Sequence, residues 1–278
     1  MLLSETQKFD IYTCVLDGSS EAPCAAICNE FYQGSLMDYN TVYNFGKRVD
    51  LLTIEIEHVN IDALIKLEEE GLKVFPQPHI LKTIQHKGEQ KDFFTKNDIP
   101  TAPYHRFNNL EALLKADLKL PFVWKSAQFG YDGMGVKIIK SVSQLQELPN
   151  EACLAESLIP FKNELAVIVA RNSDGETRTY PVVEMEFHPE ANQVEYVICP
   201  ARISVEVSDK ARNIALTVAE AFGHIGLLAI EMFQTKDDEI LVNEVAPRTH
   251  NSGHYSIEAS YTCLLYKSDA ADDFAVVW

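Results

Sequence analysis

The chain has 278 residues, 46% hydrophobic and 23% charged, a balance that is typical of folded globular proteins and too apolar for a disordered chain. Its 24 Lys and Arg residues stand against 41 Asp and Glu residues, which gives a formal charge of −17. A surface of this sign repels a polyanion, so we expect no nucleic-acid partner. A small anion can still bind where a few lysines, backbone N–H groups and a metal ion are placed locally.

No apolar run approaches the roughly 20 residues that a membrane-spanning helix needs, so we expect no membrane partner. The first residues, MLLSETQKFD, lack the basic flank and long apolar core of a signal peptide. The six cysteines are scattered and show neither CxxC spacing nor a zinc pattern. We interpret them as buried thiols and expect a cytoplasmic protein.

Strands and helices alternate in the first part of the chain. The expected elements are strands at 11–17, 49–56 and 73–76, and a helix that Asn60 caps and Gly71 ends. This alternation predicts a parallel α/β unit over residues 1–85. The unit lacks the apolar first strand and glycine-rich turn with which open nucleotide-binding α/β domains usually begin.

From residue 86 onward the pattern changes, and the predicted strands are candidates for antiparallel pairing. We predict helices at 86–98, after Asn109 and at 208–222, and strands at 121–127, 136–140, 163–171, 177–187 and 194–198. Two further strands, 227–233 and 239–245, are joined by a polar turn and read as a hairpin.

A glycine-rich segment, GYDGMG at 130–135, connects two of these predicted strands. Its glycines allow the backbone to approach a phosphate closely and to point N–H groups at it. Taken alone, the segment is equally typical of an ordinary hairpin turn. Lys125 strengthens the phosphate hypothesis, because a cation at the end of the apolar strand PFVWK needs an anionic partner.

The predicted hairpin carries two glutamates, Glu231 and Glu244. If Gln234 pairs with Glu239 at the turn, Glu231 faces Val242. Glu244 then lies diagonally on the same face, at about 7–8 Å. Unpaired carboxylates in apolar strands are costly, and Mg²⁺ favours one or two carboxylates together with phosphate oxygens. The pair therefore predicts a divalent-cation site, although two solvated acids on an edge strand remain the alternative.

A polar segment, NEVAPRTHNSGH at 243–254, directly follows this strand. Five of its side chains can donate hydrogen bonds to a small oxyanion: Arg248, His250, Asn251, Ser252 and His254. Five such residues within seven positions, beside an acid suited to a metal, favour a binding site over a structural role.

These motifs resemble the 5-(carboxyamino)imidazole ribonucleotide synthetases, ATP-grasp enzymes of purine biosynthesis that pair GYDGxG with NExAPRxHNSGH. The resemblance covers about residues 1–263 and includes TIEIEHV at 53–59 and the QK of 90–91. It implies an α/β (α+β) protein in which a partial Rossmann-like pre-ATP-grasp domain, 1–85, precedes an ATP-grasp domain, 86–263. Residues 264–278 do not resemble the family, so we expect a tail in place of the family's C-terminal domain, and slow turnover of the ribonucleotide.

The resemblance also implies roles for individual residues. The residues expected to bind ATP are Lys87, Lys125, the loop Gly130, Tyr131, Asp132, Gly133, Met134, Gly135 and Val136, the strand Glu156, Ser157, Leu158 and Ile159, the ribose acid Glu164, and Asn243 with Glu244. Glu231 and Glu244 are the expected ligands of Mg²⁺, with Mn²⁺ as an alternative. Catalysis falls to Arg248, His250 and Asn251, and Glu57 is expected to lie near the ribonucleotide.

The implied reaction converts ATP and bicarbonate to carboxyphosphate, whose carboxyl group passes to the amino group of 5-aminoimidazole ribonucleotide. A homodimer is the expected assembly. Two alternatives are a formate-dependent glycinamide ribonucleotide transformylase, which shares APRxH but continues differently from NSGH, and a non-catalytic nucleotide-binding module. Retention of Glu231 and Glu244 argues against the second, and ADP release with bicarbonate would separate it from an enzyme.

Overall fold

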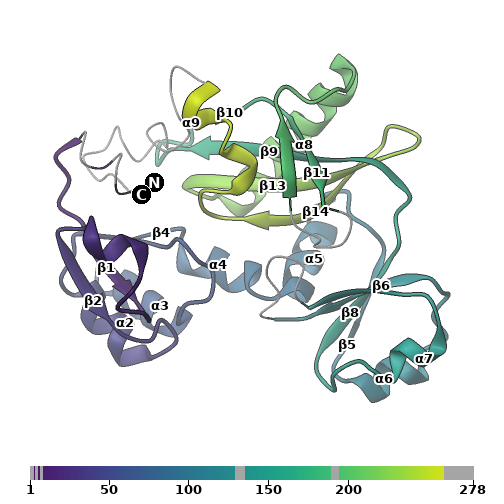
Figure 1. Ribbon diagram of the computed structural model, residues 1–278, viewed down its shortest axis with the longest axis horizontal. Helices are drawn as coiled ribbons and strands as arrows, with labels where there is room; N and C mark the ends of the chain where they lie inside the picture. The colour runs from purple at the N-terminus through teal and green to yellow at the C-terminus, as the bar shows by residue number, and fades with distance from the viewer. Residues whose placement is uncertain (1–2, 4–5, 7–8, 129–134, 189–193, 260–278) are drawn as a thin grey trace.

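The computed structural model describes residues 3, 6, 9–128, 135–188 and 194–259. Figure 1 shows three regions: an N-terminal α/β unit, a four-stranded sheet with two short helices, and a larger sheet with one long helix. Two helices, α4 and α5, lie between them (Figure 1). No helix within the described residues is long and apolar enough to cross a bilayer.

The N-terminal unit holds two pairs of parallel strands, as the alternating pattern predicted. The first pair is β1 (Cys14–Asp17) with β2 (Glu30–Gln33), and the second is β3 (Leu51–Thr53) with β4 (Lys73–Phe75). The helices are α2 (Tyr39–Gly46), α3 (Ile61–Glu69) and the 3-10 turn η2 (Pro23–Ala26). The strands predicted at 11–17 and 49–56 are shorter than expected, while β2 and α2 lie where no element was assigned. Past Thr53, the chain leaves the sheet and reaches Glu57.

Local capping chemistry fixes the helix boundaries of this unit. Asn60 caps α3 by accepting a 2.9 Å hydrogen bond from the Ala63 N–H group, as predicted. Gly71, at a φ of +94°, lies just past the end of α3 in the left-handed region that glycine favours. Leu52, Leu64, Leu67 and Val74 are buried together in the core of the unit.

Helices α4 (Pro78–Ile84) and α5 (Lys87–Lys96) connect the N-terminal unit to the rest of the chain. The sequence pattern predicted α5 but not α4, which has only seven residues. His86 caps α5, because its ring Nδ1 accepts hydrogen bonds from the N–H groups of Gly88 and Glu89 at 3.1 and 3.2 Å. The Lys87 N–H group also bonds to the Ala127 carbonyl at 2.9 Å, so α5 begins at the end of a strand of the four-stranded sheet.

The four-stranded sheet is antiparallel, in the order β5-β8-β6-β7. Its strands are β5 (Tyr104–Phe107), β6 (Phe122–Ser126), β7 (Val136–Ile139) and β8 (Cys153–Ser157). Helices α6 (Leu110–Lys115) and α7 (Val142–Leu145) contribute Leu110, Leu113 and Leu145 to its core around Trp124. Strand β5 was not predicted from the sequence.

The larger sheet is also antiparallel, in the order β12-β11-β9-β13-β14, with β10 beside β9. Its strands are β9 (Phe161–Arg171), β10 (Thr177–Thr179), β11 (Val183–Phe187), β12 (Val194–Ile198), β13 (Gly226–Thr235) and β14 (Ile240–Ala246). Helix α8 (Val205–Phe222) packs on it and forms the largest core with β9, β13 and β14. A 3-10 turn, η3 (Asn251–Gly253), and α9 (Ser256–Ala259) follow.

Two predictions for this sheet were wrong in detail. The single strand expected at 177–187 is two strands, β10 and β11, separated around Pro181, which has no N–H group to give to a sheet ladder. The helix expected at 208–222 begins at Val205, because Ser204 caps it through the Val207 N–H group at 3.3 Å.

Candidate active site

A cavity of about 850 Å³ lies where the N-terminal unit, α5 and both sheets meet. Part of its wall is apolar: the rings of Phe161 and Phe233 stack with their centroids 4.9 Å apart, beside Leu158 and Ile159. The remaining wall is strongly charged. The ionisable side chains that line it are Glu57, His58, Lys87, Lys125, Glu156, Glu164, Glu231, Glu244, Arg248 and His250.

The hairpin of β13 and β14 places Glu231 and Glu244 directly opposite each other. The predicted register, with Glu231 facing Val242, was wrong for two reasons. Thr235 rather than Gln234 pairs with Glu239 across a three-residue turn, whose last residue, Asp238, has a φ of +60°. A β-bulge then shifts the register of β14 once more.

The bulge adds Asn243 to the strand and brings the two carboxylates closer than the predicted diagonal. Directly opposed residues of an antiparallel pair have Cβ atoms about 4.5–5.5 Å apart, against about 7–8 Å for a diagonal pair. The bulged segment is fixed from outside the hairpin, because the Val242 N–H group donates to the Pro100 carbonyl at 2.7 Å.

Both carboxylates lie against cationic or potentially cationic side chains. The Lys87 ammonium group is 2.5 Å from Glu244 Oε2, and the His250 Nε2 atom is 3.2 Å from Glu231 Oε1. The charge of Lys87 holds the pKa of the Glu244 carboxyl well below its usual range. Burial opposes the charged form of Lys87, but the carboxylates of Glu244, Glu156 and Glu231 together outweigh it and raise the pKa of that ammonium group.

Glu164 lies on β9 among these acids, and within the described residues no lysine forms an ion pair with it. Burial, and then the negative charge of Glu231, raise the pKa of the Glu164 carboxyl to about 7. This carboxyl group can therefore exchange a proton near neutral pH, or be held ionised by hydroxyl groups that donate to it.

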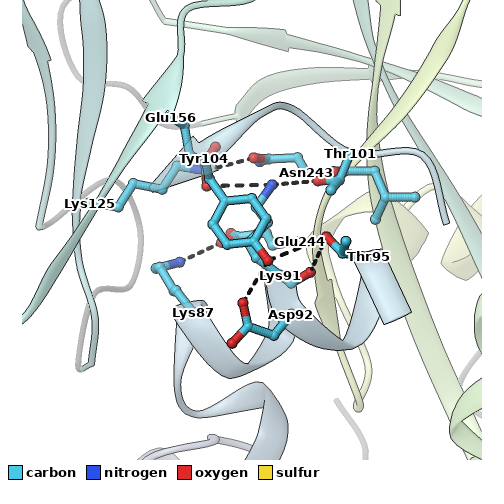
Figure 2. A network of polar contacts seen from close by, with 11 residues as sticks. Lys87, Lys91, Asp92, Thr95, Thr101, Tyr104, Lys125, Glu156, Asn243 and Glu244 are labelled. Carbon is cyan, nitrogen blue, oxygen red and sulfur yellow. Dashed lines mark hydrogen bonds and ion pairs between the residues drawn. The ribbon is translucent and has the colours of Figure 1, made fainter. Parts of the chain in front are cut away.

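Lys125, on β6, belongs to a buried network with α5 and β14 (Figure 2). Its ammonium group is 3.0 Å from Glu156 Oε2 and donates to Asn243 Oδ1 at 2.9 Å. Glu156 also pairs with Lys91, at 3.4 Å. Burial raises the cost of the Glu156 charge, but Lys125 and Lys91 together lower the pKa of this carboxyl.

The segment after β14 joins the cavity to the N-terminal unit. Arg248 Nε donates to Glu57 Oε1 at 2.8 Å, and His250 Nδ1 is 2.9 Å from the Ser252 hydroxyl. The side-chain oxygen of Asn251 is buried and has no hydrogen-bond partner within the described residues. A ligand with a hydroxyl or amino group could therefore donate to Asn251.

Two family models match the chain: a ribonucleotide synthetase pre-ATP-grasp domain over residues 1–85 and an ATP-grasp domain over 92–263. Among solved structures, the N5-carboxyaminoimidazole ribonucleotide synthetase of Thermotoga maritima is 37% identical, with a TM-score of 0.88, over 100% of this chain and 73% of that one. This chain belongs to the N5-carboxyaminoimidazole ribonucleotide synthetase family of ATP-grasp proteins. That membership confirms the resemblance and decides against the glycinamide ribonucleotide transformylase alternative.

Two further relatives show the range of this synthetase family. The synthase of Aspergillus clavatus, solved in complex with ADP and 5-aminoimidazole ribonucleotide, is 31% identical with a TM-score of 0.88 and is covered to 74%. The phosphoribosylaminoimidazole carboxylase of Ogataea methanolica is 35% identical over 94% of this chain and 50% of its own length. The chain thus spans about half the length of the first curated relatives that it matches.

Among the described residues, the structure brings every predicted site residue except Gly135 to one cavity. Those lining it are Glu57, Lys87, Lys125, Val136, Glu156, Ser157, Leu158, Ile159, Glu164, Glu231, Asn243, Glu244, Arg248, His250 and Asn251. Gly135 lies just before β7 at a φ of +79°. The loop residues Gly130, Tyr131, Asp132, Gly133 and Met134 lie outside the described residues.

Sequence reasoning assigned no role to Lys91, Thr101, Phe161 or Phe233. Lys91 could have been noticed, because it follows Lys87 by four residues and so shares its helix face. Phe161 and Phe233 come from different strands, and no pattern in the sequence predicts that their rings stack.

Proposed function

We propose that this chain catalyses the ATP- and bicarbonate-dependent carboxylation of 5-aminoimidazole ribonucleotide to N5-carboxyaminoimidazole ribonucleotide. The observation that carries the proposal is the single cavity where Lys87, Lys125 and two opposed carboxylates meet Arg248 and Glu57. ATP would lie with its base against the apolar wall and its phosphates toward the lysines. Glu164 would accept hydrogen bonds from the ribose hydroxyls.

The chemistry has two steps. A bicarbonate oxygen attacks the γ-phosphorus of ATP and ADP leaves, which gives carboxyphosphate. The amino nitrogen of the ribonucleotide then attacks the carboxyl carbon, phosphate leaves, and the nitrogen loses a proton. Phosphoryl transfer depends on positioning and charge neutralisation, which Lys87 and Lys125 supply at the phosphates and Arg248 at the bicarbonate.

The acids of the hairpin suit a magnesium ion. Glu231 and Glu244 are opposed on neighbouring strands and offer the hard oxygen ligands that Mg²⁺ prefers, and Mn²⁺ takes the same ligands. The described residues hold no cluster of three or more His, Cys, Asp or Glu side chains suited to a metal ion. A cation held by these two acids would therefore take its other ligands from phosphate oxygens and water. When bound, it would neutralise charge that develops on the phosphates.

The ion requirement can be tested by thermal denaturation. ATP with Mg²⁺ should raise the melting temperature, since a ligand that binds only the native state stabilises it by mass action, by about 2.7 kcal/mol at 100 times Kd. Glu244→Gln should lose most of the Mg²⁺-dependent part of this rise. The control is Glu111→Gln, an exposed change on α6. An undiminished rise in Glu244→Gln would remove Glu244 from the metal site.

The reaction is tested by measuring ADP and carboxylated product together, with and without bicarbonate and ribonucleotide. We expect ADP release that depends on bicarbonate, and product only when the ribonucleotide is present. ADP without product would restrict the activity to carboxyphosphate formation, and no bicarbonate-dependent ADP would favour the non-catalytic nucleotide-binding module. We also propose that the protein is cytoplasmic and forms a homodimer. Analytical ultracentrifugation would measure the mass of the assembly.

A further inference from the structure

Lys91 lies in the buried polar network of Figure 2 without reaching the cavity. It follows Lys87 by one turn of α5, and its side chain is only 3% exposed. Its ammonium group is 3.4 Å from Glu156 Oε1, while Lys125 lies 3.0 Å from the other carboxylate oxygen. One buried carboxylate thus holds two lysines, of which only Lys125 lines the cavity.

A hydroxyl group fixes the position of Lys91. The Lys91 ammonium group donates to Thr101 Oγ1 at 2.6 Å, and that hydroxyl donates to the Val242 carbonyl at 2.7 Å. Thr101 also forms a parallel bridge with Val242, next to the bulge that carries Asn243. Lys91 is therefore anchored through Thr101 to β14, the strand that carries Glu244, and cannot turn toward the cavity without breaking these bonds.

The charge of Lys91 does not help to stabilise the fold. Lys125 and Glu156 by themselves form a neutral buried pair, and a further buried ammonium group pays a desolvation cost. Burial, partly offset by Glu156, lowers the pKa of Lys91 to about 8. An apolar side chain of similar length would fill the same space at less cost, so the charge of Lys91 calls for another explanation.

We infer that Lys91 is a positioning residue: its charge, 3.4 Å from Oε1 of Glu156, offsets that carboxylate and leaves the charge of Lys125 available to the phosphates of a nucleotide. With both lysines present, the three side chains carry a net charge of +1, and Lys125 is the cation exposed to the cavity. Without Lys91, Glu156 neutralises Lys125, and a phosphate must compete with a buried carboxylate for it. The inference rests on the proposed nucleotide site.

The test compares ATP with adenosine, because only ATP has phosphates for Lys125 to bind. Calorimetry gives the ratio of the adenosine Kd to the ATP Kd, here called the phosphate increment. We expect Lys91→Met to lower this increment by about tenfold or more, the size of one charged hydrogen bond, while the adenosine Kd changes less than about twofold. An ion pair of purely structural importance would change both Kd values alike or neither.

A double variant sharpens the test. In Lys91→Met combined with Glu156→Gln, the carboxylate that captures Lys125 is gone, so the phosphate increment should return toward that of the unmodified chain, whatever happens to adenosine. Lys115→Met is the matched control, because it removes an ammonium group from an exposed pair with Glu111 on α6. If Lys91→Met does not fold, Lys91→Gln removes the same charge and keeps a hydrogen-bonding group.

The outcomes separate the two proposals. If the unmodified chain binds ATP no more tightly than adenosine, the nucleotide site itself is wrong. If it has a phosphate increment and both Lys91 variants keep it, or if the double variant fails to restore it, the role given to Lys91 is wrong while the site stands.

Discussion

His224 follows Gly223, the residue that caps the end of helix α8, and its imidazole ring is buried, with 1% of the residue exposed. Nε2 lies 2.8 Å from the Leu227 carbonyl, which requires a proton on that nitrogen, and Nδ1 has no hydrogen-bond partner in the described part of the chain. Burial lowers the pKa of His224 to about 4. The ring is therefore neutral in the folded protein near pH 7.

Because the pKa of His224 is lowered in the folded protein, we predict that the protein loses stability in mild acid. Between pH 6.5 and 4 the unfolded chain binds a proton at His224 that the folded chain does not, so the free energy of unfolding falls as pH falls. The loss over this range is up to about 3 kcal/mol. Urea unfolding from pH 7 to 5 should show the slope, and His224→Gln should flatten it. The exposed His79→Gln is the control, and equal slopes in both variants would contradict the assignment.

Residue identities predicted most of the candidate site. The types and spacing in GYDGMG and NEVAPRTHNSGH were sufficient for the resemblance, and Asn243, Glu244, Arg248, His250 and Asn251 line the cavity. Of the five predicted donors, Ser252 and His254 do not line it. The partners of those residues were not predictable. Nothing in the sequence indicates that Glu156 holds both Lys91 and Lys125, since the three come from different elements.

At the scale of elements, helices α2 and α3 pack with almost no space at Gly46. A Cβ atom added there would lie 2.2 Å from Leu67 Cδ1 and 2.8 Å from Leu67 Cδ2. Leu67 is 1% exposed in the core of the N-terminal unit, so its side chain has little room to move.

We predict that Gly46→Ala destabilises the protein although alanine favours helices. Overpacking a core costs about 1–3 kcal/mol, which exceeds the gain in helix propensity of about 1 kcal/mol over most of that range. The urea midpoint should therefore fall. Gly18→Ala is the matched control, because the nearest atom to its Cβ is the Gly34 carbonyl oxygen at 4.0 Å. A midpoint as high as that of Gly18→Ala would show that the two helices can adjust.

The elements that the sequence predicted well carry their own signals. Asn60 before an amphipathic run and the polar turn between two apolar strands each marked a boundary. The elements missed, such as α2, α4 and β5, have four to eight residues, which is too short for a clear hydrophobic periodicity. The bulge at Asn243 was missed because Pro100 and Thr101, far away in sequence, hold that strand.

For the whole molecule, Gln77 links the N-terminal unit to the larger sheet. Its side chain donates to the Gly223 carbonyl at 2.9 Å and accepts from the Ile225 N–H group at 3.1 Å, so it bonds both sides of the turn between α8 and β13. Gln77→Ala removes both of these partly buried hydrogen bonds.

We predict that Gln77→Ala lowers the free energy of unfolding by about 1 kcal/mol, because the two hydrogen bonds that it removes are only partly buried. Scanning calorimetry should show this as a lower melting temperature. Gln33→Ala removes a longer, exposed hydrogen bond to Gly18, at 3.4 Å, and should change the melting temperature little. If the two variants melt alike, Gln77 does not couple the two parts of the molecule.

The sequence by itself predicted the alternating strands and helices from local spacing and capping, and its motifs carried the resemblance that implied the family and the residues of the candidate site. Only the tertiary structure decided how the charges are shared: which lysine meets which glutamate, and that Glu231 and Glu244 are directly opposed. The physical reason is that a charge pair depends on distances of a few ångströms between elements far apart in sequence. Those distances are set by packing, turns and one bulge, which the linear pattern does not contain.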